Sequence, residues 1–270
     1  MWTGQDASGL ALRGEAALPR NHLLRAFPQR DLERLIPSLQ RVSLTARRVL
    51  QHAGVPIEHV YFIEDGLVSV LVSTDEGSAV EAWMIGREGA IGTATLLGVR
   101  TSPLRHFVQI GGSALRIRVE DLNRAMEEMP QLKAIMHSYV HATLVQSSQS
   151  AACSLSHALL QRLARWLLTA QDRSVRDELP ITQDLLARSL GVRRATVSEA
   201  LKPLVQGRIF ARERGLIRIL DRARLEEIAC RCYRLMRPRR EQPEQAGNGR
   251  GRLYALSAFC ALLEIELLAQ

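Results

Sequence analysis

The sequence predicts an α+β protein with an N-terminal jelly-roll-like β-barrel, a long helix and a C-terminal winged helix-turn-helix. Three observations lead to this prediction. The first half of the chain alternates apolar and polar residues between regularly placed glycines, a segment free of Gly and Pro follows, and two short helical patterns joined at a glycine then lead into a basic hairpin. A chain of 270 residues is long enough for two domains, each with its own core.

Residues 41–118 are expected to form the barrel, because apolar residues alternate there as they do in half-buried strands. Glycines recur in this segment every 11 or 12 residues, at Gly54, Gly66, Gly77 and Gly89. This spacing is typical of short antiparallel strands, in which glycine supplies the positive φ of a tight turn. Asp65-Gly66 and Glu76-Gly77 are predicted hairpin tips, and a short helix is expected before the barrel at residues 31–39.

The next segment changes to a helical pattern. A short helix is expected at residues 121–129 and a long one at about 131–151, which contains neither Gly nor Pro. A stripe recurs on the long helix every three or four residues, at Leu132, Ile135, Tyr139 and Thr143. This spacing fits the seam of a two-stranded coiled coil and favours dimerisation through the helix. Packing of the same stripe against the chain's own barrel is the alternative.

The pattern at residues 183–201 is typical of a helix-turn-helix. The small side chain of Ala187 lets two helices approach, Gly191 makes the turn between them, and Val197 anchors the second helix. Thr182 is placed to cap the first helix through its hydroxyl. The motif therefore predicts a recognition helix that begins soon after Gly191.

The second helix and the hairpin after it offer the groups expected of a DNA reader. Residues 208–221 alternate around a turn at Arg214-Gly215 and predict a basic wing. Residues 173–240 contain 17 Lys and Arg against 8 Asp and Glu, so the chain's net charge of +8 is concentrated there, as phosphate binding favours. The predicted DNA-binding residues are Thr182, Arg193, Arg194, Ala195, Thr196, Ser198, Glu199, Lys202, Arg212 and Arg214.

These patterns divide the chain into five predicted parts. They are an N-terminal extension at 1–25, a sensor barrel at 26–130, a dimerisation helix at 131–155, a winged-helix DNA-binding domain at 156–236, and a linker and tail at 237–270. Helices at 157–170 and 224–235 are expected to complete the DNA-binding domain.

Residues 26–222 resemble the Crp/Fnr family of bacterial transcription regulators. The resemblance rests on the long helix, the pair Gly89 and Gly92, and two motifs, Val60-Tyr-Phe-Ile-Glu-Asp-Gly66 and Leu185-Leu-Ala-Arg-Ser-Leu-Gly-Val-Arg-Arg-Ala-Thr-Val. It implies a homodimer joined along the long helix, with a cyclic-nucleotide-binding-like barrel as sensor and the winged helix as reader. The implied function is a DNA-binding transcription regulator whose partners are palindromic double-stranded DNA and RNA polymerase.

Two departures from the family pattern concern the effector. Relatives that bind cyclic AMP carry Glu soon after the glycine pair, whereas here Gly92 is followed by Thr93-Ala94-Thr95. They also carry an Arg-Ser step before the next strand, whereas the segment here reads Thr101-Ser-Pro-Leu-Arg-His-Phe. A cyclic phosphate would lose its charge-assisted hydrogen bonds, so cyclic AMP is not the expected effector. A different small molecule and a barrel filled by its own side chains are the two alternatives. The predicted pocket residues are Gly89, Gly92, Thr93 and Arg105.

No pattern in the sequence indicates catalysis, a cofactor or a metal. A nucleophile elbow, a phosphate loop and a metal-ligand motif are all missing, so we expect no enzyme activity, no cofactor and no metal site. The four cysteines, Cys153, Cys230, Cys232 and Cys260, lack a C-x-x-C pair and are expected to be reduced thiols. Cys230 and Cys232 are expected on one helix, where residues two apart point to different faces.

The location and the rival function follow from the same patterns. No apolar run reaches the length of a membrane span, and the N-terminus lacks the apolar centre of a secretory signal, so a cytoplasmic protein is expected. The alternative function is a nucleotide-binding-like regulatory module that acts through protein contacts without reading DNA.

Overall fold

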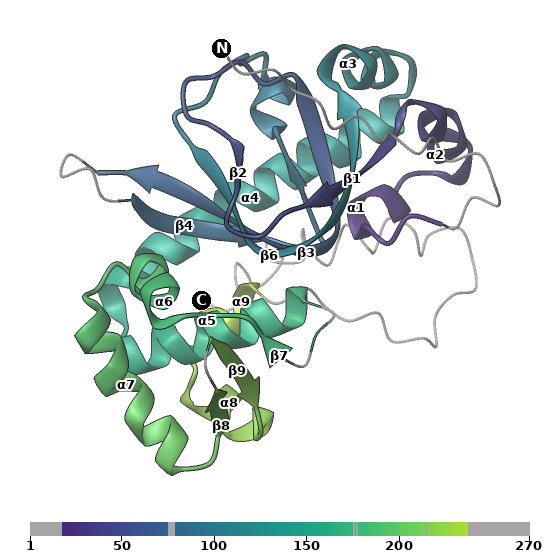
Figure 1. The fold of residues 1–270 in the computed structure, drawn as a ribbon. Coiled ribbons are helices and arrows are strands. Elements are labelled where there is room, and N and C mark those ends of the chain that lie inside the picture. Colours follow the sequence, from purple (N-terminus) through teal and green to yellow (C-terminus); the bar gives the residue numbers. More distant parts are fainter. Residues whose placement is uncertain (1–17, 75–78, 175, 177, 214, 237–270) are drawn as a thin grey trace, which may run out of the picture.

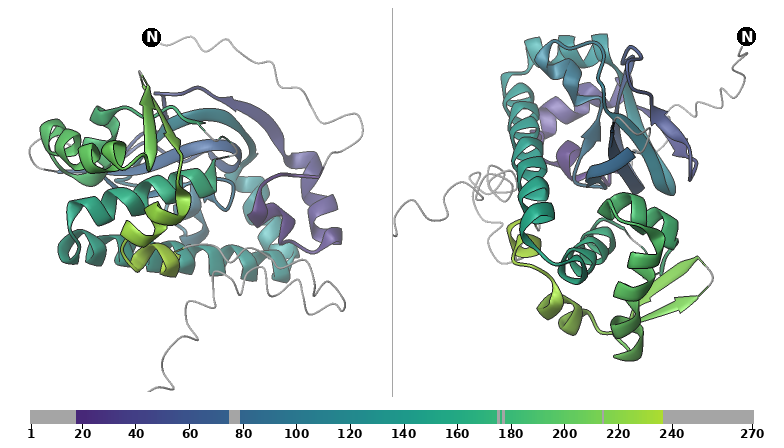
Figure 2. Two further views of the ribbon diagram at one scale, coloured as in Figure 1. Left: turned by 90° about the horizontal axis from the view of Figure 1, so that it is seen from below. Right: turned by 90° about the vertical axis from the view of Figure 1, so that its left-hand side faces the viewer.

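The computed structural model describes residues 18–74, 79–174, 176, 178–213 and 215–236. An N-terminal antiparallel sheet with flanking helices lies beside a C-terminal body of helices and a small sheet (Figure 1). The long helix α4 (Pro130–Ser156) runs along the first body and reaches the second, as the right-hand view of Figure 2 shows. This architecture confirms the predicted α+β fold class, with a jelly-roll-like N-terminal domain, a long helix and a winged helix-turn-helix.

Short helical segments precede the sheet, namely α1 (His22–Arg25), α2 (Gln29–Leu35) and η1 (Ile36–Ser38). The buried Asn21 caps α1, because its side-chain oxygen accepts from the backbone N–H of Leu24 at 3.0 Å. The helix predicted at residues 31–39 thus begins earlier and changes to a 3₁₀ turn. Pro37 lies in this turn and has no N–H to continue an α-helix.

The sheet contains β1 (Gln40–Leu44), β2 (Val49–Gln51), β3 (His59–Ser73), β4 (Ala79–Ile85), β5 (Ala90–Ile91) and β6 (Arg105–Arg118). The strands are antiparallel in the order β1-β6-β3-β4, with β2 paired to β6 and β5 to β3. A 3₁₀ segment, η2 (Thr93–Leu97), lies between β5 and β6. The long strands β3 and β6 pair along most of their length, and their inner faces carry the barrel core.

Strand β3 runs without interruption through Asp65-Gly66, so the hairpin tip predicted at this dipeptide is wrong. The register between β3 and β6 shifts on both sides of Asp65, which marks a β-bulge. Gly66 has a φ of +98°, and a Cβ atom there would lie 2.5 Å from the carbonyl oxygen of Ile110. Glycine at this position therefore serves a bulge within a strand. The tip predicted at Glu76-Gly77 lies outside the described residues.

Helices α3 (Val119–Glu128) and α4 pack against the barrel. Leu132 and Tyr139 are buried there, and the Tyr139 hydroxyl accepts from the Ala90 N–H at 2.9 Å and donates to the Ala90 carbonyl at 3.1 Å. The assignment of Leu132 and Tyr139 to a dimer seam is therefore wrong, because both side chains pack inside their own protomer. Ile135 and Thr143 are partly buried and stay as predicted seam residues.

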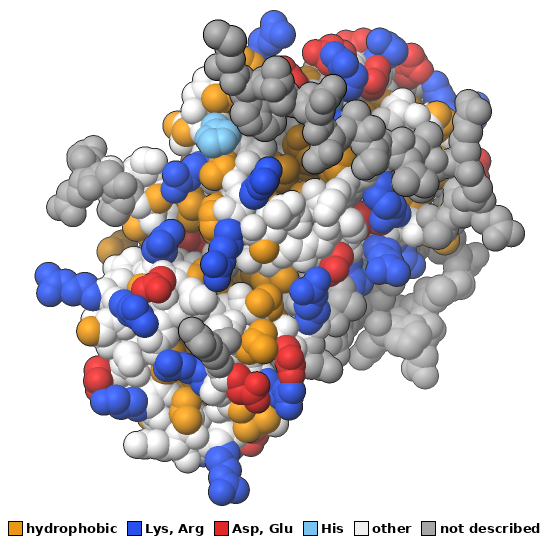
Figure 3. Space-filling model, viewed as in Figure 1, with side chains coloured by type: hydrophobic (Ala, Val, Ile, Leu, Met, Phe, Trp, Pro, Cys, Tyr) orange, Lys and Arg blue, Asp and Glu red, His pale blue; other side chains and the backbone are white. Residues whose placement is uncertain are grey.

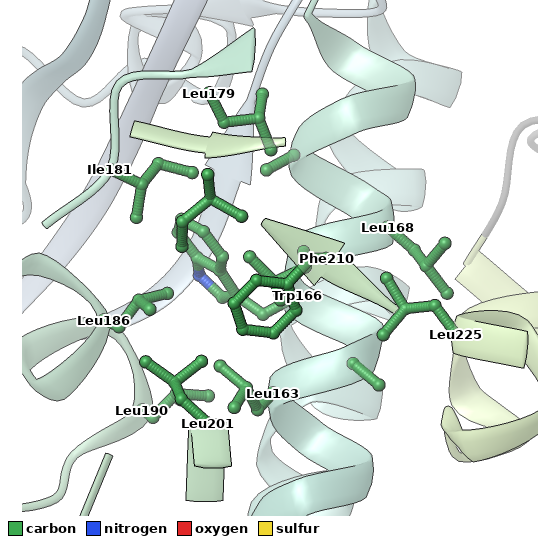
Figure 4. Packing of buried hydrophobic residues seen from close by; sticks show 14 of the residues in the cluster. Leu163, Trp166, Leu168, Leu179, Ile181, Leu186, Leu190, Leu201, Phe210 and Leu225 are labelled. Atoms are coloured by element: carbon green, nitrogen blue, oxygen red, sulfur yellow. The ribbon is translucent and has the colours of Figure 1, made fainter. Parts of the chain in front are cut away.

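The C-terminal domain contains α5 (Leu159–Arg173), β7 (Glu178–Leu179), α6 (Gln183–Leu190), α7 (Arg194–Gln206), β8 (Phe210–Glu213), β9 (Leu216–Ile219), α8 (Arg222–Ile228) and α9 (Cys232–Met236). Its strands pair in the order β7-β9-β8. Trp166 and Phe210 lie in the middle of its core, surrounded by leucines of the neighbouring helices (Figure 4). Glu213 pairs with Leu216, which confirms the predicted hairpin around Arg214-Gly215.

The segment predicted as one helix at residues 224–235 forms two short helices, so that prediction is wrong. Helix α8 ends at Ile228, Ala229 is extended with φ −63° and ψ 143°, and α9 begins only at Cys232. Cys230 therefore precedes α9 and does not share a helix with Cys232. Both cysteines are buried in one cluster with Cys153 of α4, contrary to the expectation that they point to different faces.

The two bodies meet at a buried ion pair. Arg173, the last residue of α5, places its Nε 2.9 Å from Oε1 of Glu88, and their side chains are only 2% and 8% exposed. The Arg173 guanidinium also donates to the carbonyl of Met84 at the end of β4. The backbone approaches so closely that a Cβ on Gly86 would lie 2.6 Å from the Cβ of Arg173.

A second polar contact joins the two bodies at Glu81 of β4. Its carboxylate accepts hydrogen bonds from Ser69 and Gln109 of the sheet, from Trp166 of α5 at 2.7 Å and from Ser189 of α6 at 3.0 Å. Burial raises the pKa of Glu81, while the hydrogen bonds from Ser69, Trp166 and Ser189 lower it. A cavity of about 260 Å³ lies beside this carboxylate, between β4, α4, α5 and α6.

Candidate nucleic-acid interface

Helices α6 and α7 form the predicted helix-turn-helix. The Thr182 hydroxyl accepts from the Leu185 N–H at 3.3 Å, which confirms the predicted cap. Gly191 ends α6 in the left-handed region, with φ 65° and ψ 39°, a conformation that glycine adopts without strain. Ala187 and Val197 are buried where the helices meet, so the three positions that define the motif have the predicted roles.

The N-terminal half of α7 faces solvent. Its cap Arg193 and the side chains of Arg194, Thr196 and Glu199 are exposed, whereas Val197 between them is fully buried. One face thus anchors the helix and the other is open to a partner. Most of the predicted DNA-binding residues that the structure describes are exposed, namely Arg193, Arg194, Ala195, Thr196, Glu199, Lys202 and Arg212. Thr182 and Ser198 are partly buried.

Two ion pairs order the charged side chains of this face. Arg194 Nε lies 3.5 Å from Oδ1 of Asp184 on α6, and Lys202 Nζ lies 2.7 Å from Oε1 of Glu199. All four side chains are more than half exposed, so each pair contributes little to stability and opens at small cost. Glu199 therefore pairs with Lys202, and the side chain that orients Arg194 is Asp184.

The wing extends the same basic surface. Arg212 is exposed on β8, and Gly215 has a φ of +79° at the tip of the hairpin. Arg218 on β9 forms an ion pair with Glu178 of β7. Arg214, which was predicted to contact DNA, lies outside the described residues. Basic side chains are spread over the visible face of the C-terminal domain, with acidic ones between them (Figure 3).

The residues predicted to form an effector pocket lie near strand β5 and at the start of β6. Gly92 has a φ of +90° and precedes η2, in which Thr93 is the first residue. Gly89 lies against α4, because a Cβ there would be 2.2 Å from the Tyr139 hydroxyl oxygen. Arg105 begins β6, and its Nε is buried without a hydrogen-bond partner among the described residues. None of the four lines the cavity beside Glu81.

One group of chemically active side chains was missed by sequence reasoning. Cys153, His157, Cys230 and Cys232 come together at the C-terminal end of α4. The cysteines at 153 and 230 are far apart in the chain, and an unbroken helix at residues 224–235 would have separated Cys230 from Cys232. The available signal was the C-x-C pair itself together with a third Cys, Cys153, four residues before a His.

The geometry of α6, α7 and the β8–β9 hairpin defines a winged-helix DNA-binding domain. Residues 161–228 match the family described as the Crp-like helix-turn-helix domain. The transcriptional regulator SdrP of Thermus thermophilus is 24% identical over 198 residues, which cover 70% of this chain and 94% of that protein. No helix among the described residues is both long enough and apolar enough to cross a membrane.

Solved structures share the fold of most of the described chain. FixK2 from Bradyrhizobium japonicum superposes with a TM-score of 0.62 at 18% identity, covering 71% of this chain and 98% of that one. TTHB099, a CRP family transcriptional regulator from Thermus thermophilus, gives a TM-score of 0.59 at 18% identity, covering 70% and 96%. The chain is thus a DNA-binding transcription regulator with a Crp-like helix-turn-helix domain.

Arg194 offers the most direct test of the interface. We expect Arg194→Ala to weaken binding to the selected operator by about 1–3 kcal/mol, because an exposed arginine near the start of a recognition helix can form a bidentate pair with guanine. Binding to random DNA of the same length should change little. Fluorescence anisotropy on both DNAs, with exposed Arg30→Ala on α2 as control, measures the two effects. An equal loss on both DNAs would instead assign Arg194 to the phosphate backbone.

Proposed function

We propose that two copies of this chain bind a palindromic operator through α7 and the wing, and that they regulate transcription at promoters. The observation that carries this proposal is the exposed N-terminal half of α7, held in place by the buried Val197. Two-fold symmetry would present two such helices to successive major grooves, about 34 Å apart. Regulation at promoters would involve RNA polymerase in the cytoplasm.

Each predicted contact residue has a proposed role that follows from its chemistry. Arg194 would read guanine, and Glu199 would accept from a cytosine amino group after release from Lys202. The remaining hydroxyl and basic side chains would bind phosphates: Thr182, Arg193, Thr196, Ser198, Lys202, Arg212 and Arg214. Ala195 would pack against a thymine methyl group.

The outer face of α4 is the proposed dimer surface. Residues on this face repeat at intervals of four and three and are all exposed: Ala134, His137, His141, Leu144, Ser148, Ala151 and Leu155. Leu144 and Leu155 are 62% and 90% exposed, so this face of α4 leaves two large apolar side chains uncovered in the single chain. The heptad spacing and the small side chains between the leucines suit close approach of a second α4. Partly buried Ile135 and Thr143 would lie at the margin of this surface.

Charging the outer face of α4 should produce monomers. Leu144→Glu with Leu155→Glu places two carboxylates against their symmetry mates, so the dimer should dissociate and operator binding should fall. Analytical ultracentrifugation measures the mass. The matched control is Leu97→Glu with Val99→Glu, which charges two exposed apolar residues of the barrel, 63% and 47% exposed. A double variant on α4 that sediments as the wild type would place the dimer surface elsewhere.

The barrel is proposed to respond to no cyclic nucleotide. Tyr139 bonds both backbone groups of Ala90, and Glu88 is paired with Arg173, so the chain's own side chains engage the backbone next to the glycine pair. Effector control would come from a different small molecule near Gly92, Thr93 and Arg105, and the alternative is a barrel filled by its own side chains. Calorimetry with cyclic AMP and cyclic GMP should show no binding at micromolar concentrations. Micromolar binding that also tightens the operator complex would overturn this proposal.

The rival function is a regulatory module that uses its winged helix for protein contacts. Enzymatic activity is a further alternative that no motif supports. DNA binding through phosphates makes affinity fall steeply with salt. A gel shift on upstream DNA at two salt concentrations therefore separates these functions, because a protein-contact module or an enzyme gives no salt-dependent shift.

A further inference from the structure

Four ligand-type side chains converge where α4 ends. Cys153 and His157 come from α4 and its C-terminal cap, Cys230 comes from the segment between α8 and α9, and Cys232 is the first residue of α9. The Sγ atoms and a ring nitrogen of these residues all lie within 4.8 Å of one another. The three cysteines are 0%, 4% and 3% exposed, so this is a buried cluster of soft ligands.

Two separations between ligand atoms match the spacing in the shell of a single tetrahedral metal ion. Cys153 Sγ lies 3.5 Å from Cys230 Sγ, and Cys232 Sγ lies 3.7 Å from His157 Nδ1. Zinc binds sulfur at about 2.3 Å and imidazole nitrogen at about 2.0–2.1 Å, which puts neighbouring ligand atoms of a tetrahedron about 3.5–3.8 Å apart. Two of the six separations among the four ligand atoms thus have tetrahedral spacing, and none of the six exceeds 4.8 Å.

The backbone explains how both halves of the cluster face each other. Cys153 and His157 are four residues apart, and the His157 N–H donates to the Cys153 carbonyl at 3.2 Å, so their side chains lie over one face of the helix end. On the other side, the break after Ile228 leaves Cys230 outside a helix, and Cys232 is the first residue of α9. A continuous helix through this segment would have turned the two thiols apart.

The surroundings suit a site that carries negative charge. Three thiolates and one Zn²⁺ leave a net charge of −1, and thiolates need donors. The Gln149 side-chain amide donates to Cys232 Sγ at 3.1 Å, from one turn before Cys153 on α4. Such an outer contact orients a ligand and supports its ionised form. Met236 packs against the cysteines and helps to exclude water.

We propose that Cys153, His157, Cys230 and Cys232 bind one Zn²⁺ ion that fastens α9 to the junction of α4 and α5. All four ligands come from the protein, which is typical of a structural zinc site and leaves no open position for catalysis. Binding replaces the thiol protons with metal–sulfur bonds and releases up to three protons to solvent. Iron–sulfur clusters typically use four cysteines, so Cys₃His ligation favours zinc.

The location gives the ion a mechanical role. His157 is extended, with φ −118° and ψ 144°, and separates α4 from α5 at the passage from the barrel to the DNA-binding domain. Helix α9 has only five residues and would have little stability alone. A zinc ion would tie this short helix, and through it the end of the winged helix, to the last turn of α4.

Metal analysis of the full chain tests the proposal. Protein purified without chelator from zinc-supplemented cells should contain about one zinc per chain. Replacement by Co²⁺ should give the visible absorption of a tetrahedral cobalt–thiolate site, and removal by chelator should lower the melting temperature. These wild-type measurements do not depend on whether any variant folds.

Variants locate the ligands. Cys153→Ser, Cys230→Ser and Cys232→Ser should each lose the stoichiometric zinc, and His157→Ala should weaken its retention. The matched controls are Cys260→Ser, which removes a thiol outside the described residues, and His141→Ala, which removes an exposed histidine of α4. Both controls should keep one zinc per chain. Gln149→Ala should lower zinc affinity by about 10–100-fold.

Three outcomes would overturn the proposal. The first is wild-type protein that binds no zinc after reduction and zinc addition, with all four thiols reacting freely. The second is a Cys153–Cys230 disulfide found by peptide mapping of freshly purified protein, which would consume two of the ligands. The third is equal loss of zinc in Cys260→Ser, which would move the site to the tail.

Discussion

The ion pair between Arg173 and Glu88 is the constraint on which the arrangement of this molecule depends. Burying an arginine costs free energy unless an opposite charge compensates it. Arg173 belongs to the C-terminal body, and its compensating carboxylate, Glu88, belongs to the N-terminal body. Separating the two bodies would expose or orphan both charges. The pair therefore fixes the end of α5, and with it the DNA-binding domain, against the segment that follows β4.

The Glu81 network extends this constraint to the helix-turn-helix. Ser189 of α6 donates to Glu81, and Gly191 at the end of α6 lies close to Val80 of the same strand. Helix α6 is thus held by the barrel, while α7 turns away from it and keeps its N-terminal half exposed. One set of contacts both fixes the domain and leaves the reading face open. A structural change in the barrel near β4 would therefore alter the contacts of α6 first.

Local patterns predicted the parts of the molecule that local chemistry determines. Thr182, Gly191 and Val197 were predictable because a cap, a left-handed turn and a buried anchor depend on residues within one turn of each other. The face of α4 that meets the barrel was not, because a helical stripe does not identify its partner. Leu132 and Tyr139 could pack on either partner, and only the tertiary structure assigns them to the barrel.

The bulge at Gly66 and the cluster of Cys153, His157, Cys230 and Cys232 also depend on residues far apart in the chain. Asp-Gly is a common turn signal, but its meaning here depends on the carbonyl of Ile110 in a strand more than forty residues away. Cys230 joins Cys153 only because the chain breaks its helix between Ile228 and Cys232. The exposed residues of α7 were predicted by type and spacing, whereas the pairing of Arg194 with Asp184 depends on how α6 and α7 cross.

The free energy of unfolding of Arg173→Met tests the importance of the junction most directly. Our account predicts a loss of about 3–5 kcal/mol relative to the wild type, because Glu88 is left buried without its partner. The control, Arg218→Ala, breaks the exposed pair with Glu178 and should cost less than about 1 kcal/mol. Equal and small losses in both variants, measured by urea unfolding, would contradict the claim that this ion pair holds the two bodies together.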